Sequence, residues 1–169
     1  MNGKTIDLDA FDSFNSEDGS YSTRCVCGAV NTLRPESIHA PIVKMKCSGC
    51  YMHYEVRVSN MNVGAAHYYQ KQYREAIKHF LLFLEENPND GERRRDVEHN
   101  VFECYSILYS TSDDESEKRA CVEAFHALFP QSRFNFESPN PLPTITPESF
   151  RHFVDEKLSQ LRTLCSDIQ

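Results

Sequence analysis

The sequence predicts a mainly α-helical protein that begins with a small β unit organised by a metal ion. Three observations lead to this fold class. Cys25 and Cys27 form one close cysteine pair, and Cys47 and Cys50 form a second pair shortly after it. Apolar and polar residues alternate between and after the two pairs, as in β-strands. From Asn60 onward, apolar residues recur at three and four positions, which is the period of amphipathic helices.

Composition limits the class of protein. The chain has 169 residues, is 40% hydrophobic and carries a formal net charge of −7. It is long enough for a modest core, and its acidity argues against a generic nucleic-acid binder. No apolar run approaches membrane-spanning length, and the first residues lack the apolar stretch of a signal peptide. We therefore expect a cytoplasmic protein with no membrane partner, whose clustered thiols bind metal rather than form disulfides.

The first segment, residues 1–22, is polar and acidic with isolated apolar residues. This composition predicts a mostly disordered tail. The spacing of Leu8, Phe11 and Phe14 leaves a second interpretation open, in which a short helical turn docks on another surface.

Residues 23–58 contain the four cysteines and the alternating segments. Thiolates at this spacing can close one tetrahedral zinc site, because each short pair forms a tight turn that presents two sulfurs inward. Gly28 and Gly49 provide the permissive backbone that such turns need. The unit looks like a zinc ribbon with one zinc ion, and four thiolates leave no open position, so the ion is expected to be structural. His39 and His53 are alternative ligands.

The segment from Asn60 to Asp90 predicts a helical hairpin. Small, aromatic and proline residues stand at five spaced positions: Gly64, Tyr73, Ala76, Phe80 and Pro88. In this register the segment 57–90 resembles a tetratricopeptide repeat (TPR) closely, although His67 and Phe83 replace two other signature residues of the family. The resemblance implies two antiparallel helices that pack face to face.

The rest of the chain predicts further helices. Helical patterns over 97–109 and 112–129 indicate a divergent second repeat, so that TPR-like hairpins span residues 59–130. Residues 131–145 are rich in proline and predict an extended connection, and residues 146–166 predict an amphipathic C-terminal helix. Because two repeats are few for a stable array, we expect the ribbon and this last helix to cap the ends, or the protein to form a homodimer.

The TPR resemblance also implies a binding groove. In that family the first helix of each repeat lines a concave surface, and the corresponding residues here are Met61, Ala65, Tyr68, Tyr69, Phe102, Tyr105 and Tyr109. The Lys and Asn with which some family members clamp a carboxylate are absent. The groove is aromatic and apolar instead, which suits a hydrophobic peptide or helix of a partner protein. In the alternative interpretation, the ribbon or the C-terminal helix covers these side chains.

These observations favour a non-enzymatic protein–protein interaction adaptor or scaffold. No catalytic motif is present, and Cys104, Cys121 and Cys165 lie in helical apolar stripes typical of inert core residues. The order of Cys-x-Cys-Gly, Cys-x-x-Cys and a hydrophobic strand resembles zinc-ribbon modules of bacterial regulatory proteins.

Two other functional readings stay open. In the first, a less favoured one, a nucleic-acid-binding regulator uses the basic residues of the ribbon. These are Arg24, Arg34, Lys44, Lys46 and Arg57. In the second, the acidic N-terminal segment occupies the groove until a partner displaces it.

Overall fold

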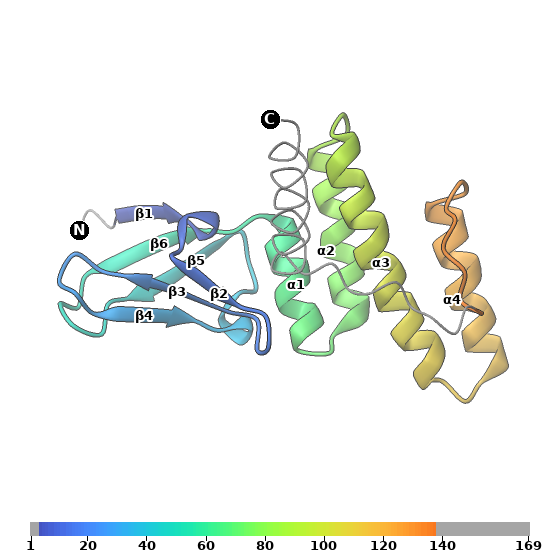
Figure 1. The fold of residues 1–169 in the computed structure, drawn as a ribbon, viewed down its shortest axis with the longest axis horizontal. Helices are drawn as coiled ribbons and strands as arrows, with labels where there is room; N and C mark the ends of the chain where they lie inside the picture. Colours follow the sequence, from blue (N-terminus) through green and yellow to red (C-terminus); the bar gives the residue numbers. More distant parts are fainter. Residues whose placement is uncertain (1–3, 138–169) are drawn as a thin grey trace, which may run out of the picture. The chain divides into compact units, whose positions relative to one another are not determined.

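The computed structural model describes residues 4–137 and shows two small three-stranded β-sheets followed by four packed α-helices (Figure 1). The fold is therefore a mixture of β and α structure, with a larger β part than the sequence predicted. We call residues 4–58 the β unit and residues 59–137 the helical region. Most of the expected 131–145 connection and the whole 146–166 helix lie outside the described residues.

The first sheet has the strand order β1-β6-β5. Its strands are β1 (Lys4–Asp7), β5 (Ile42–Lys46) and β6 (His53–Arg57). β5 and β6 pair antiparallel, whereas β1 pairs parallel to β6 with Lys4 opposite Tyr54. Alternate residues of β5 and β6 are buried, as expected for strands with one face on a core.

The second sheet is an antiparallel meander of β2 (Ser13–Asn15), β3 (Ser20–Arg24) and β4 (Val30–Leu33). Two short 3-10 helices, η1 (Leu8–Ala10) and η2 (Pro35–Ser37), connect the strands of the two sheets. One core of buried residues serves both sheets, and it extends into the first helix.

The expectation of a disordered N-terminal tail is wrong for residues 4–22. This segment forms β1, η1, β2 and most of β3. Leu8 is only 1% exposed in the core of the β unit, and Ile6 and Phe11 pack against that core. The isolated apolar residues therefore supply core contacts, and strand pairing satisfies the polar backbone around them. The β unit accordingly begins before residue 23.

The helices follow the predicted pattern of hairpins. They are α1 (Asn60–Tyr69), α2 (Tyr73–Glu86), α3 (Gly91–Thr111) and α4 (Glu115–Leu128), and each packs against the next. Ser59, Asp90 and Asp114 cap α1, α3 and α4, because each side chain accepts a hydrogen bond from a backbone N–H of the first turn.

Gly64 allows α1 and α2 to approach closely. A Cβ atom at this position would lie 2.6 Å from two carbon atoms of the Phe80 ring. The small residue is therefore required by packing.

A short segment after α4 returns over the helices. Phe134 stacks on Phe102 of α3 with 4.5 Å between the ring centroids, and Phe136 lies against Phe102, Tyr109 and Phe125. Alternate residues of this segment are half-buried. Phe134 and Phe136 thus add an aromatic layer to the core of the helical region.

Tyr69, at the end of α1, joins the helical region to the β unit. Its hydroxyl group donates a hydrogen bond to the backbone carbonyl of Ser16, and its ring meets Phe14 and the backbone of Gly19. A nearby amide, Gln70 Nε2, donates to the carbonyl of Pro35. The β unit and the four helices belong to one compact unit.

Gly19→Ala is expected to lower the free energy of unfolding by about 1–3 kcal/mol. The φ angle of Gly19 is +73°, a strained conformation for alanine, and the new methyl group would overlap the Tyr69 ring. Urea unfolding, followed by tyrosine fluorescence, measures the change. Gly28→Ala is the matched control, because Gly28 also has a positive φ but no atom lies within 4 Å of its added Cβ. Equal losses in both variants would contradict close packing of Tyr69 on Gly19.

Candidate metal centre

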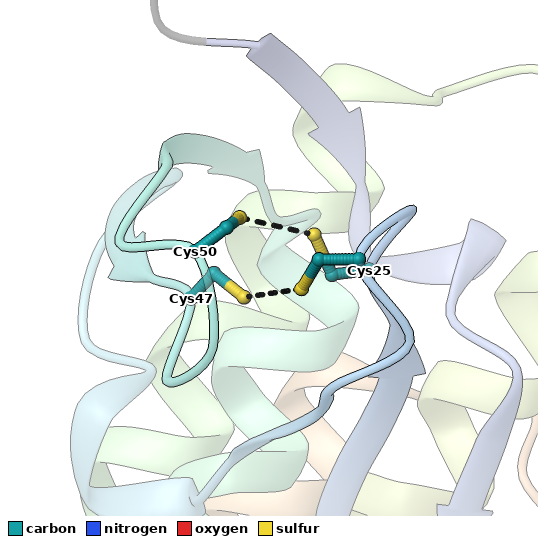
Figure 2. A group of neighbouring side chains, drawn as sticks. Cys25, Cys47 and Cys50 are labelled. Carbon is teal, nitrogen blue, oxygen red and sulfur yellow. Dashed lines mark hydrogen bonds between the residues drawn. The ribbon is translucent and has the colours of Figure 1, made fainter.

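Two turns of the β unit bring the four predicted cysteines together. The first knuckle, residues 25–28, lies between β3 and β4, and the second knuckle, residues 47–51, lies between β5 and β6. All four sulfur atoms lie within 4.8 Å of one another. In Figure 2 the labelled side chains of Cys25, Cys47 and Cys50 point toward one another. The sulfurs of Cys25 and Cys50 lie 3.6 Å apart, as do those of Cys27 and Cys47. The predicted clustering is confirmed.

The backbone of the two knuckles fits this arrangement closely. Gly28 has a φ of +90°, which glycine adopts at little cost. A Cβ on Gly49 would lie 2.8 Å from Cβ of Ala29 and 3.0 Å from the sulfur of Cys27. The equivalent of Gly28 in the second knuckle is Tyr51, which directly follows Cys50 and has a φ of +61°.

Polar groups around the cluster donate hydrogen bonds to two of the sulfurs. The Tyr54 hydroxyl lies 2.9 Å from the sulfur of Cys25, while the Asn31 amide and the Gly49 N–H lie 3.5 and 3.4 Å from the sulfur of Cys47. Asn31 is itself held in place, because its Oδ1 accepts a hydrogen bond from the backbone N–H of Ser48. Such second contacts orient ligands and stabilise thiolates.

The acidity of the thiols reflects these contacts. Backbone hydrogen bonds from Cys50 and Gly49, together with the Asn31 amide, lower the pKa of Cys47 to about 6. The pKa of Cys25 is also lowered, first by the backbone N–H of Cys27 and then by the Tyr54 hydroxyl. The hydrogen bond to Cys25 in turn raises the pKa of Tyr54 to about 12. A hydrogen bond from the Met52 backbone lowers the pKa of Cys50, but burial and the neighbouring thiols, Cys25 first, outweigh it and raise that pKa to about 11. Because a metal binds the thiolate form, the contacts of Cys25 and Cys47 favour metal binding.

The cluster is therefore consistent with one metal site of four cysteine ligands. Cys25 and Cys47 are buried, whereas Cys27 and Cys50 face solvent. The histidines considered as alternative ligands, His39 and His53, are exposed. The metal-ligand cluster found among residues 4–137 includes neither histidine.

Sequence reasoning missed the role of Asn31 and the hydrogen bond of Tyr54. Asn31 occupies an inward position of β4, where the alternating pattern calls for an apolar residue. A buried amide in a strand next to a cysteine knuckle was the available signal. Tyr54 falls on the buried face of β6, where its hydroxyl needs a partner.

The residues of the predicted TPR groove have partners within the chain. Met61, Tyr68 and Tyr105 pack against the helical core, and Tyr68 also donates a hydrogen bond to Glu103. Phe102 is buried, and its ring contacts those of Phe134 and Phe136.

The other three groove positions lie in different surroundings. Tyr69 contacts the β unit, and Tyr109 lies against Phe136. Ala65 is half-buried. The chain itself thus covers a large part of the predicted groove.

The basic residues of the β unit do not form an uninterrupted face. Arg57 forms an ion pair with Asp7 at 2.9 Å, and Lys44 stands opposite Glu55 in the strand register. The ammonium group of Lys46 lies 4.9 Å from the centroid of the Tyr51 ring.

The scan against protein-family models and the searches of curated proteins and of solved structures each found no match. No helix within residues 4–137 has the length and apolarity needed to cross a membrane.

Proposed function

We propose that this protein is a non-enzymatic protein–protein interaction adaptor whose β unit is held together by one structural zinc ion. One observation carries the proposal. Among residues 4–137, five of the six large apolar side chains that are exposed lie in the β unit, and two of them, Val26 and Tyr51, directly adjoin a cysteine ligand in the sequence. The five are Val26, Val30, Ile42, Tyr51 and Met52.

Zinc is the metal that this donor set suits best. Four thiolates in a small, tight cluster favour a soft or borderline ion with tetrahedral geometry, and zinc meets both conditions. With four protein ligands the ion has no free position for a water or a substrate, so it supplies folding energy rather than catalysis. This role is in keeping with the small area that each three-stranded sheet can bury.

Exposed apolar side chains on a rigid support are typical of interaction surfaces. Val26 stands between two ligands of the first knuckle and is 83% exposed, and Met52 follows the second knuckle. Metal binding fixes both turns, so a partner would meet these side chains already in position. We interpret the helices as two TPR-like hairpins that support this surface, because their own groove residues pack within the chain.

The proposal is tested by affinity purification with the zinc-loaded protein as bait and mass spectrometry as readout. The double variant Val26→Ser/Met52→Ser removes two apolar side chains of the surface. Leu82→Ser is the matched control, because Leu82 is the exposed apolar residue that lies on α2, away from the cysteines. We expect the same discrete set of proteins with wild type and with the control, and its loss with the double variant. Enrichment that the double variant leaves unchanged would contradict the proposed surface.

A further inference from the structure

The second knuckle holds a tyrosine in a backbone conformation that favours glycine. Tyr51 has a φ of +61°, while Gly28 stands at the equivalent position of the first knuckle with a φ of +90°. A bulky residue at positive φ is an outlier, because its Cβ crowds the neighbouring carbonyl groups. The surrounding turn imposes this conformation: the N–H of Tyr51 donates to the carbonyl of Cys47, and the N–H of Cys47 donates to the carbonyl of Met52.

Core packing does not compensate for this strain. The Tyr51 side chain is 65% exposed, and the ring contact found for it is the ammonium group of Lys46. A glycine here would relieve the backbone without emptying a core position. Strain that is kept at an exposed residue points to a function of its side chain.

The surroundings of Tyr51 indicate the chemistry of a partner. Met52 follows it directly in the sequence, and the exposed Val26 belongs to the other knuckle of the same four-sulfur cluster. Two cations lie at the same knuckles: Lys46 stands above the Tyr51 ring, and the Arg24 guanidinium donates to the carbonyl of Gly28. A ligand for this place needs an apolar group for the ring and negative charge for the cations.

We propose that Tyr51 is the anchor of a docking surface, completed by Val26 and Met52, for an apolar peptide segment flanked by carboxylates in a partner protein. This inference rests on the proposed function and names its contact residue and partner chemistry. The exposed tyrosine supplies rigid amphipathic contact area, as anchors of protein interfaces commonly do. Lys46 and Arg24 select acidic residues beside the apolar group.

A nucleic acid is the other ligand that an exposed aromatic ring and nearby cations can bind, by stacking on a base. The charges of this chain favour a protein instead. Beyond Lys46 and Arg24, acidic residues neutralise the cations of the adjacent sheet, where Arg57 pairs with Asp7 and Lys44 lies opposite Glu55. The long phosphate backbone of a nucleic acid would lie near these carboxylates as well as the cations, and the carboxylates would repel it.

The test starts from a displayed random peptide library, selected on the zinc-loaded full chain. We expect a consensus with an aliphatic or aromatic residue between Asp or Glu residues. A synthetic peptide of that consensus is then titrated against wild type, Tyr51→Gly and Tyr51→Phe. Tyr51→Gly should weaken binding about tenfold or more, as loss of an interface anchor does, and Tyr51→Phe should retain most of it. Lys46→Glu should weaken the same peptide and make its binding less sensitive to salt, because an attractive charge pair is lost.

A second readout separates an anchor from a structural residue. Tyr51→Gly should keep one zinc ion per chain and melt at the same temperature as wild type or higher, because glycine relieves the positive φ. A variant that loses zinc or melts earlier would show that Tyr51 supports the fold, and would overturn the proposal.

The remaining outcomes are equally decisive. Peptides that still bind Tyr51→Gly but not Val26→Ser/Met52→Ser would leave the adaptor function standing and remove Tyr51 as its anchor. If a thymidine oligonucleotide binds and Tyr51→Gly abolishes that binding, the partner is a nucleic acid and the proposal falls. If no peptide is selected and no protein is captured, the proposed function fails together with this inference.

Discussion

Removal of zinc is expected to abolish the ordered structure of the β unit. Cys47 is fully buried, and the cysteine cluster joins a turn of one sheet to a turn of the other. Structural zinc sites contribute apparent binding free energies of about 10–16 kcal/mol, which exceeds the stability of most small domains. Chelation of the metal, or Cys47→Ser, should therefore remove the strand signals in an amide NMR spectrum, including those of β1, which pairs only through β6.

The controls for this prediction lie within the chain. Cys104→Ser changes a buried thiol of α3 that is not in the cluster, so it should keep one metal ion per chain. Cobalt added to the metal-free wild type should restore the strand signals and give the absorption of tetrahedral thiolate ligands. Strand signals that survive complete chelation would show that apolar packing alone holds the β unit, and would refute a structural role for the metal.

The helices and the cysteine cluster were predictable because local signals determine them. Asp114 caps α4 through its own side chain, and the periodic apolar residues before Pro88 mark α2. Each cysteine pair also predicts its own tight turn, because its two cysteines are only two or three positions apart in the sequence. Within each helix and within each cysteine pair the interacting residues are near one another in the sequence, so that a pattern records them.

The N-terminal strands were missed because their partners are distant. Lys4 pairs with Tyr54 and Asp7 with Arg57, and no local pattern encodes a parallel pairing across fifty residues. An acidic segment with scattered apolar residues has the composition of a disordered tail, and only the sheet of β5 and β6 gives it a place to pack. Tyr51 differs from this case. The missing glycine after Cys50 was visible in the sequence, but its meaning required the backbone angle.

Phe125→Ala is expected to lower the free energy of unfolding by about 3–5 kcal/mol. Phe125 is fully buried on α4, where its ring contacts those of Phe102, Phe129 and Phe136. Truncation to alanine removes these contacts and leaves a cavity that three fixed rings cannot easily fill. Urea unfolding followed by far-ultraviolet circular dichroism measures the change, with Glu123→Ala as the control because Glu123 is exposed on the same helix.

The same residue shows whether the segment after α4 is part of the core. Phe136 is half-buried, so Phe136→Ala alone should cost less than Phe125→Ala. In a double-mutant cycle the two losses should not add, because residues in contact share part of their packing energy. Additive losses would mean that Phe136 does not pack on Phe125 in solution. The predicted groove would then be open over α3 and α4. Phe102 and Tyr109 would be exposed there and could bind a partner in place of the surface proposed on the β unit.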